Sequence, residues 1–472
     1  MGTVGRDSVA GDSVGWDSVV WDSDPAYSEL RSALCWNARV PDRYPRAIAR
    51  AASRVEVAEV VRLARAGGLK VSARSSGHNF CVAALRSGGV LLDVSALDTI
   101  SVDRAASRVS VGPGVTGERL VGELAQHGLT FPVGHCPGVA LGGYLLGGGA
   151  GWNFGSVGPA CASVRGVELV DAGAEVLAAG GGHNEDLLWA ARGGGPGFPG
   201  IITRYDLQAY PLARFIARTE WIVPLALLDE VAGWVSAVAE LLPAAVEVFF
   251  YAGSVRPGAP PGAMAEDHDA RVILLRGIAF AGTEAQARSM LAPLADPPFA
   301  GHGVKIADVA RQTMRQLMAA SGAMHPDGHR YAVDQLWLAG KPGTGLGAVA
   351  AHLAAAPSPR SHALFFVTSN ADNDSAGMDL AFSRTDNWYV LLSAIWRDRT
   401  RDAVNVRWLE ELVAMLEPSA TGYYVNETDL FASPQRASNC FTTQHWRRLQ
   451  DVKRSRDPDD VFASHPRSED LR

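Results

Sequence analysis

The sequence of 472 residues predicts an α+β protein with two domains. A chain of this length is too long for one hydrophobic core. Strand-like runs recur several dozen residues apart in its second half, with helical runs between them, which is typical of a broad, mostly antiparallel sheet covered by helices. Ten glycines lie between Gly134 and Gly158, a density that costs backbone entropy and packs nothing inside a helix or strand. We therefore expect this glycine-rich stretch to press its backbone against a flat or phosphorylated ligand.

Composition narrows the classes of function. The formal net charge is −7 and the pI is near 6.0, which gives no electrostatic reason to expect nucleic acid or an anionic membrane as a partner. No run approaches the roughly 20 apolar residues of a membrane span. The five cysteines are an odd number spread over a long chain, which favours a reducing, cytoplasmic compartment over a disulfide framework. The sequence leaves open whether the protein is a monomer or a homodimer.

The beginning of the chain has a repeat of its own. Asp-Ser recurs at a period of five, with Asp7, Asp12, Asp17 and Asp22 in phase. This period matches neither a helix nor a strand, and no basic segment precedes an apolar core as a signal peptide requires. We expect residues 1–30 to form a disordered tail.

The elements expected in the first domain are short and mixed. A helix is expected from Val57, because Val57, Val60, Val61 and Ala64 share one face and Gly67 follows. The further elements expected are strands at 69–73, 90–93, 109–112 and 204–209, helices at 118–126 and 186–192, and a hairpin of 167–170 with 175–177. This domain is predicted to end near Pro211.

Longer elements are expected in the second domain. A long amphipathic helix is predicted at 231–242, where Pro243 stops it. The strands expected are 246–251, 271–280, 331–338, 362–368 and 388–395, and the helices are 284–294 and 404–416. The open face of their sheet would form a substrate wall. An exposed, proline-rich loop is expected from Pro257 to Gly262.

The expected strand at 69–73 runs into the turn Arg74-Ser75-Ser76-Gly77-His78. A strand that ends in a turn of small residues can converge several backbone N–H groups on a phosphate. The nucleotide loops of other protein classes fit the glycine-rich stretch less well. A P-loop needs Lys and Ser/Thr where Gly148 and Gly149 stand, and a Rossmann fingerprint needs glycine where Phe154 stands.

Five segments carry a resemblance to a known family. They are Arg74-Ser75-Ser76-Gly77-His78, Gly134-His135-Cys136-Pro137-Gly138-Val139, Gly147-Gly148-Gly149-Ala150-Gly151, Asp186 to Gly195, and Tyr424-Val425-Asn426. With them in this order, the chain from about Trp36 to Phe462 resembles the berberine-bridge-enzyme-like branch of the vanillyl-alcohol oxidase and p-cresol methylhydroxylase (PCMH) superfamily. The resemblance implies the two-domain, PCMH-type FAD-binding fold of that superfamily.

The resemblance also implies how FAD is held. His78 would be bonded to the 8α methyl group of the flavin and Cys136 to its carbon 6, and Cys161 is expected to be structural. Two tethers should prevent loss of the flavin and raise its potential. The other residues implied to contact the cofactor are Arg74, Ser75, Ser76, Gly77, Gly134, Val139, Gly142, Gly143, Gly147, Gly148, Gly149, Gly151, Trp152, Gly200, Ile202 and Asn426.

A hydride donor must also lose a proton, so a base near the flavin is expected. The resemblance makes Tyr424 the first candidate, with its phenol pKa lowered by a nearby cation, for which Arg384 could serve. Glu427, where many relatives have Tyr, is the next catalytic candidate. Tyr424 and Asn426 are expected on one strand, where a period of two puts both side chains on one face. Weaker candidates for the substrate wall are Asp334, Asp386, Trp337, Tyr389 and Trp396.

The implied organisation is an FAD-binding domain at 31–211, a substrate domain at 212–432 and a return to the first domain at 433–472. The implied function is an FAD-dependent oxidase that removes hydride from a C–H next to O or N of a small alcohol, sugar or amine. O2 would reoxidise the flavin and give H2O2, along a path that the small Val139 leaves open. An oxidative cyclase or tailoring enzyme of natural-product biosynthesis is the alternative, and a non-catalytic flavin-binding protein is the remote alternative. No metal is expected, because Pro326 and Gly328 spoil a helical pair of His325 and His329.

Overall fold

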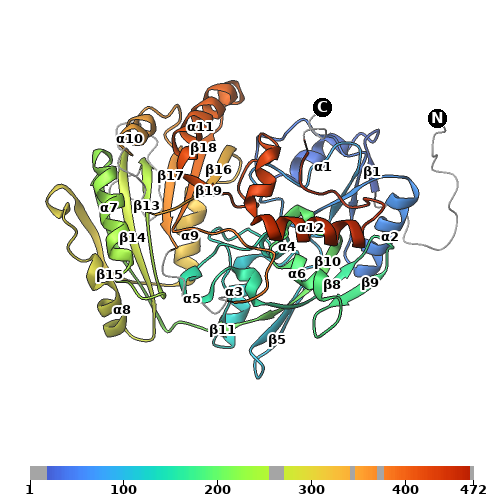
Figure 1. The fold of residues 1–472 in the computed structure, drawn as a ribbon, viewed down its shortest axis with the longest axis horizontal. Helices are drawn as coiled ribbons and strands as arrows, with labels where there is room; N and C mark the ends of the chain where they lie inside the picture. The colour runs from blue at the N-terminus through green and yellow to red at the C-terminus, as the bar shows by residue number, and fades with distance from the viewer. Residues whose placement is uncertain (1–18, 255–270, 341–345, 369–376, 468–472) are drawn as a thin grey trace.

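The computed structural model describes residues 19–254, 271–340, 346–368 and 377–467. The Asp-Ser repeat up to residue 18 and the loop expected from Pro257 to Gly262 lie outside these ranges. Figure 1 shows two parts side by side, one around a broad sheet that carries the labels β13 to β18 and one around the smaller sheets of the N-terminal segment. In the described ranges, no helix is long and apolar enough to cross a membrane.

The first sheet has the strand order β1-β2-β4-β3, where β2, β4 and β3 run parallel and β1 is antiparallel. Its strands are β1 (Val19–Trp21), β2 (Ala47–Arg50), β4 (Val90–Asp93) and β3 (Val71–Arg74), with helices α1 (Tyr27–Ala33) and α2 (Arg54–Ala66) beside them. The prediction of a disordered tail is therefore wrong for residues 19–30. Val19 already pairs with Ala49, and the side chain of Tyr27 in α1 is buried.

The second sheet is antiparallel throughout, in the order β5-β6-β10-β8-β9. Its strands are β5 (Ile100–Asp103), β6 (Arg108–Val111), β10 (Ile201–Gln208), β8 (Val164–Val170) and β9 (Val176–Ala179), and the predicted hairpin is its β8–β9 pair. Around it lie the helices α3 (Gly117–Gln126), α4 (Leu141–Leu146), α5 (Phe154–Val157) and α6 (Glu185–Ala191), and the short strand pair β7 (Leu129–Thr130) and β11 (Tyr210–Pro211).

The third sheet confirms the predicted large antiparallel sheet. Its order is β15-β12-β14-β13-β17-β18-β16-β19, and every pair in it is antiparallel. The strands are β15 (Val304–Gln312), β12 (Phe215–Pro224), β14 (Arg271–Ala281), β13 (Val246–Ser254), β17 (His362–Val367), β18 (Trp388–Trp396), β16 (Arg330–Leu338) and β19 (Ala420–Gly422). The helices α7 (Leu228–Ala239), α8 (Glu284–Leu291), α10 (Leu346–Ala354) and α11 (Asp402–Leu416) pack against it, and α9 (Met314–Met324) follows β15.

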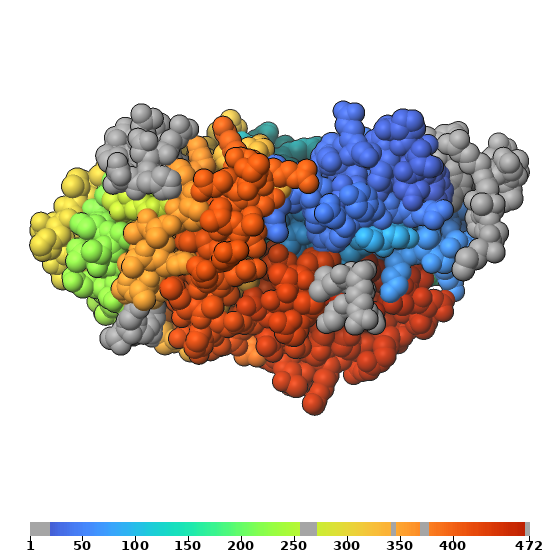
Figure 2. Space-filling model, turned by 90° about the horizontal axis from the view of Figure 1, so that it is seen from above, coloured from blue at the N-terminus to red at the C-terminus, as the bar shows by residue number. Residues whose placement is uncertain are grey.

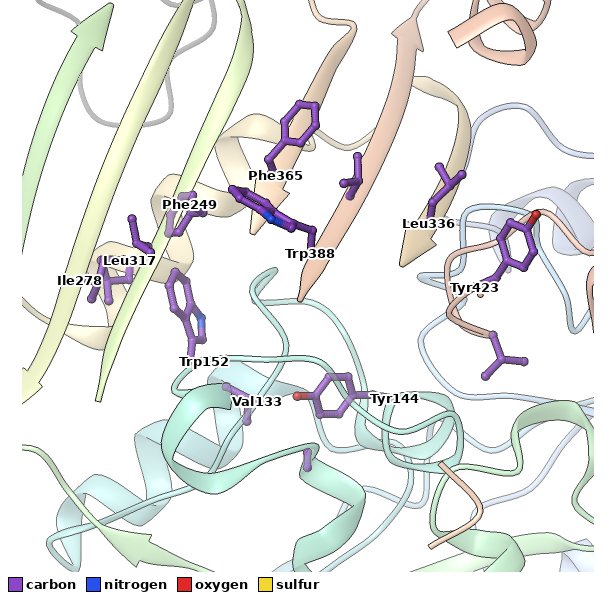
Figure 3. Close-up of a cluster of buried hydrophobic side chains, with 14 of the residues drawn as sticks. Val133, Tyr144, Trp152, Phe249, Ile278, Leu317, Leu336, Phe365, Trp388 and Tyr423 are labelled. Atoms are coloured by element: carbon purple, nitrogen blue, oxygen red, sulfur yellow. The ribbon is translucent and has the colours of Figure 1, made fainter. Parts of the chain in front are cut away.

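One hydrophobic core joins the two parts. Val133, Tyr144 and Trp152 of the glycine-rich region belong to the same buried cluster as Phe249 and Trp388 of the third sheet. Figure 3 shows Trp152 projecting from its loop toward the strands that carry Phe249 and Ile278. Because these apolar side chains are shared, the glycine-rich loops are held directly against the sheet.

The C-terminal segment returns to the first part of the chain. Helix α12 (Thr443–Arg456) packs against α6, and Phe462 bridges Val71 of β3 in parallel. In Figure 2 the red C-terminal residues lie directly against the blue N-terminal ones. Lys453 helps to fix this return, since its buried ammonium group donates to Phe462 O at 2.8 Å.

The glycine-rich stretch differs from the prediction in two ways. It contains the short helix α4, so Gly142 and Gly143 lie inside a helix after all. Several of its glycines are also required by the protein itself. A Cβ at Gly142 would collide with Ser75 Oγ, and one at Gly151 would collide with Tyr144 Oη and the carbonyl of Val133. Part of the glycine density therefore reflects close packing within the chain rather than contact with a ligand.

Candidate functional site

A cavity of about 370 Å³ lies between the loops of the first part and the third sheet. The predicted residues that line it are Arg74, Ser75, Ser76, Gly77, His78, Gly134, Cys136, Val139, Gly142, Gly143, Gly151, Gly200, Ile202, Tyr424, Asn426 and Glu427. The fold thus brings together segments that are up to about 350 positions apart in the sequence, from Arg74 to Glu427. Its opposite wall is apolar and aromatic, and includes Phe249, Tyr251, Trp337 and Phe366 of the third sheet.

The turn after β3 has the form of a phosphate cradle. Within the described residues, no hydrogen bond uses the backbone N–H groups of residues 75–79. Arg74 fixes the start of the turn by donating to Asp93 at 2.8 Å and to Leu34 O at 3.1 Å. Gly77 has a φ of 71°, and a Cβ there would collide with Leu34 O, so only glycine fits. Backbone donors without a protein acceptor are available to a pyrophosphate, and in this respect the chain fits FAD.

His78 follows the cradle and faces the cavity. Its ring stacks on Trp36, with the centroids 4.1 Å apart and an interplanar angle of 21°. Burial lowers the pKa of His78 to about 4, which keeps the imidazole neutral at physiological pH. A neutral imidazole has a free lone pair, which the proposed bond to a flavin would need.

Cys136 reaches the same cavity from the glycine-rich stretch. Gly138, two residues later, packs against His78, since a Cβ there would lie 3.5 Å from His78 Cδ2. The thiol Sγ is 3.9 Å from Nδ1 of His325, and burial raises the pKa of Cys136 to about 12. Cys161, by contrast, is fully buried and does not line the cavity.

Tyr424 and Asn426 differ from the prediction in their local structure. Strand β19 ends at Gly422, and the two residues lie on a turn in which Glu427 N–H and Thr428 N–H donate to Tyr424 O, both at 3.0 Å. Their side chains nevertheless meet, because Asn426 Nδ2 donates to Tyr424 Oη at 3.1 Å. The prediction that the side chains of Tyr424 and Asn426 lie together is therefore confirmed, although the predicted strand is wrong.

The hydroxyl of Tyr424 accepts two further hydrogen bonds, from Gly149 N–H at 2.9 Å and Ala150 N–H at 3.2 Å. Burial raises the pKa of Tyr424 above its ordinary value, although these donors oppose the increase. This contradicts the expected lowering by a cation. Arg384 does not line the cavity: its side chain packs over Gly422 and donates to Phe441 O at 3.4 Å.

Glu427 lies next to Tyr424 and faces the cavity. Its Oε2 accepts a short hydrogen bond from the hydroxyl of Tyr389, while Oε1 has no partner among the described residues. Burial raises the pKa of Glu427 to about 8. A carboxyl group with that pKa is ionised, and can accept a proton, chiefly in mildly alkaline solution, with a smaller ionised fraction at pH 7.

Several predicted residues serve the site indirectly or lie elsewhere. Gly147, Gly148, Gly149 and Trp152 do not line the cavity; Gly147 instead makes room for Asn426, and Gly148 for Phe382. Among the wall candidates, Tyr389 and Trp337 do line it. The other three do not line it. Asp334 accepts from Arg436 and Trp396 donates to Asp402, while Asp386 lies elsewhere.

Sequence reasoning missed several polar residues of the cavity. Two of them are His325, which follows α9, and Tyr251 on β13. The hydroxyl of Tyr251 makes a 2.9 Å hydrogen bond with His362 on β17, which lies behind the lining. Arg276 on β14 also lines the cavity. A signal existed for α9, since Thr313 and Gln316 form a capping box at its start. No group of three or more metal-ligating side chains is found within the described residues.

Comparison with known proteins agrees with this geometry. Residues 45–180 match the FAD binding domain family. The chain carries an FAD-binding domain and has the berberine-bridge-enzyme-like fold. BBE-like #28 from Arabidopsis thaliana superposes with a TM-score of 0.79 and 17% identity, covering 95% of this chain and 98% of the neighbour.

Two curated relatives indicate the class of chemistry. The FAD-linked oxidoreductase nodO of Hypoxylon pulicicidum is 29% identical over 445 residues, 92% of this chain and 94% of the relative. The (R)-6-hydroxynicotine oxidase of Paenarthrobacter nicotinovorans is 38% identical over 179 residues, 38% of this chain and 39% of the relative. The predictions of an FAD cofactor and of an FAD-linked oxidoreductase are confirmed.

Proposed function

We propose that the protein is an FAD-dependent oxidase that removes hydride from a C–H next to O or N of a small organic substrate. The observation that carries this proposal is the single cavity that joins the phosphate cradle and His78 to Glu427 on the sheet side. Bound there, FAD would supply hydride acceptance from the substrate and transfer of the electrons to O2, which gives H2O2. The 6-hydroxynicotine oxidase relative supports the choice of an oxidase.

Glu427 is the proposed proton acceptor. Tyr389 holds Oε2 and leaves Oε1 open to the O–H or N–H of a substrate. The pKa of about 8 suits proton uptake, whereas the phenol of Tyr424 has a pKa raised above its ordinary value. Tyr424 would instead position the backbone at Gly149 and Ala150, which both donate to its hydroxyl.

We also propose that FAD is attached covalently through both His78 and Cys136. Both residues line the cavity, and Gly138, two residues after Cys136, packs against His78, which supports this proposal. Acid-precipitated protein should keep its flavin, each single change His78→Ala or Cys136→Ala should leave one tether, and the double variant should release the flavin. Cys161→Ala, which alters a buried thiol outside the cavity, is the matched control and should keep both tethers. Flavin that separates freely from the wild-type protein would exclude the attachment.

The oxidase proposal has its own test. Anaerobic mixing with panels of alcohols, sugars and amines should bleach the flavin with at least one substrate, and admission of air should restore it with release of H2O2. No bleaching across the panels would favour the non-catalytic alternative. We do not propose an oxidative cyclase, because no described residue of the cavity favours ring closure over simple oxidation.

We also propose a division of the chain into domains. A division into 31–211, 212–432 and 433–472 is supported by β11, which ends at Pro211, by β12, which begins at Phe215, and by the return of α12 to α6. None of the five cysteines, all of which lie in the described ranges, forms a disulfide, which supports the proposed cytoplasmic location.

A further inference from the structure

Arg276 on β14 is a buried cation at one edge of the cavity. Arg276 is only 3% exposed, and its side chain lines the cavity. Among the described residues, only its Nε has a hydrogen-bond partner, Glu220 Oε2 at 2.6 Å, and its Nη2 is buried without one. A buried guanidinium group normally has several of its five donors satisfied, because an unpaired buried donor is costly.

The partner of Arg276 is shared with a second arginine. Arg218 Nη1 also donates to Glu220 Oε2, at 2.8 Å, and both arginines are largely buried. Two guanidinium groups face one carboxylate, so the cluster of Arg218, Glu220 and Arg276 carries one positive charge in excess. A charge in such surroundings is expensive unless an anion pairs with it.

The strand register places Arg276 at the end of an aromatic row. Arg276 pairs with Phe249, Phe249 with Phe366, and Phe366 with Tyr389. All four side chains line the cavity. Tyr389 in turn donates to Glu427, the proposed proton acceptor. Three strand intervals separate Arg276 from Tyr389, about 14 Å from one end of the row to the other.

We propose that the cavity binds substrates with a carboxylate, which Arg276 pairs with, and an aromatic or otherwise flat apolar body, which lies on Phe249 and Phe366. The group to be oxidised then points toward Glu427 at the other end of the row. This inference rests on the proposed function, because it takes the sheet side of the cavity, opposite the cradle, to be the substrate site. It narrows the substrate class from small alcohols, sugars and amines in general to acids that carry such a group.

Arg276→Met is the informative variant. Methionine keeps much of the apolar volume, and Glu220 retains Arg218 as its partner, so no buried carboxylate is left unpaired. Arg288→Gln is the matched control. This substitution removes the same charge, but from the surface of α8, where Arg288 pairs with Glu284. Flavin content and the thermal midpoint of each variant report whether it has folded.

Biphenyl-4-carboxylate and its neutral isostere biphenyl-4-carboxamide are suitable probes, and calorimetric titration of the holoenzyme measures both. Because charge-assisted hydrogen bonds are about twice as strong as neutral ones, we expect the carboxylate to bind roughly tenfold or more tightly than the amide. The preference should disappear in Arg276→Met and persist in Arg288→Gln. Equal binding of the two probes by the wild type, no saturable binding of either, or a preference that survives in Arg276→Met would overturn the proposal. These heats do not depend on flavin chemistry, so a failure of the oxidase proposal would show separately, as flavin that no substrate bleaches.

Discussion

Replacement of Glu427 by Gln removes the group that can accept a proton and keeps the size and shape of the side chain, including an oxygen that can accept from Tyr389. If Glu427 accepts the proton that leaves as hydride departs, the rate of flavin reduction should fall by about 10²–10⁴-fold, the usual contribution of a positioned base. Flavin content should stay unchanged, because Glu427 lies outside the cradle and the two proposed tethers. Anaerobic stopped-flow mixing with a saturating substrate, followed by flavin absorbance, measures this rate directly.

The pH profile of the same rate gives a second, independent magnitude. Burial raises the pKa of Glu427 to about 8 from an ordinary value of 4.5. At pH 7 only about one molecule in ten then carries the ionised carboxylate. The wild-type rate should therefore rise close to tenfold per pH unit below pH 8 and level off above it, while the Glu427→Gln profile should be flat over this range.

Tyr424→Phe serves as the comparison, since it removes a hydroxyl that accepts three hydrogen bonds and keeps the ring packing. We expect a smaller loss from it than from Glu427→Gln. An unchanged reduction rate in Glu427→Gln, together with a loss of more than about 100-fold in Tyr424→Phe, would refute the reasoning and assign the base to Tyr424. A wild-type rate that falls between pH 6 and pH 8 would refute it as well.

Three further predictions follow from packing, access and charge. Gly151→Ala should destabilise the protein by about 1–3 kcal/mol, because its Cβ collides with neighbouring atoms, whereas Gly122→Ala, in open space inside α3, should be neutral or stabilise by about 0.5–1 kcal/mol; thermal unfolding compares them. Val139→Leu should slow the reoxidation of reduced flavin by O2 and leave its reduction by substrate unchanged, and equal reoxidation rates would place the oxygen path elsewhere. Burial raises the pKa of Glu247 to about 8 from 4.5, so its stabilising contribution is full below about pH 4.5 and is lost as the pH rises through 8. Glu247→Gln should therefore flatten the fall of the melting temperature between pH 5 and pH 9, and a fall as steep as that of the wild type would contradict this assignment.

The sequence predicted the elements whose periodicity was uninterrupted. The apolar face of α2, the β8–β9 hairpin and the long apolar strands β13, β14 and β16 were all expected where the structure has them. The missed strands β12 and β15 have a physical reason for their weak pattern. In β12 the polar Glu220 is buried and pairs with Arg218, and in β15, at the edge of the sheet, Val304 and Ile306 are exposed.

The loops that line the candidate site could be predicted from the sequence, whereas the sheet wall opposite them could not. The cradle and the segment of Cys136 are continuous motifs, so their positions follow from the sequence by resemblance. The sheet wall depends on register across eight strands, which no local pattern reports. Arg276, His325 and the hydrogen bond from Tyr389 to Glu427 therefore emerged only from the structure. Arg384 was expected as a cation that lowers the pKa of Tyr424, whereas its side chain packs over Gly422 and donates to Phe441 O.

The mass of the intact, denatured polypeptide tests the central claim most directly. The account predicts that the wild-type chain carries the mass of one FAD after denaturation, as do the His78→Ala and Cys136→Ala variants, each through its remaining tether. The double variant should show the mass of the bare polypeptide with free FAD in solution. A wild-type chain without the added mass, with all its flavin free in the supernatant, would contradict the assignment of this cavity as a covalent FAD site.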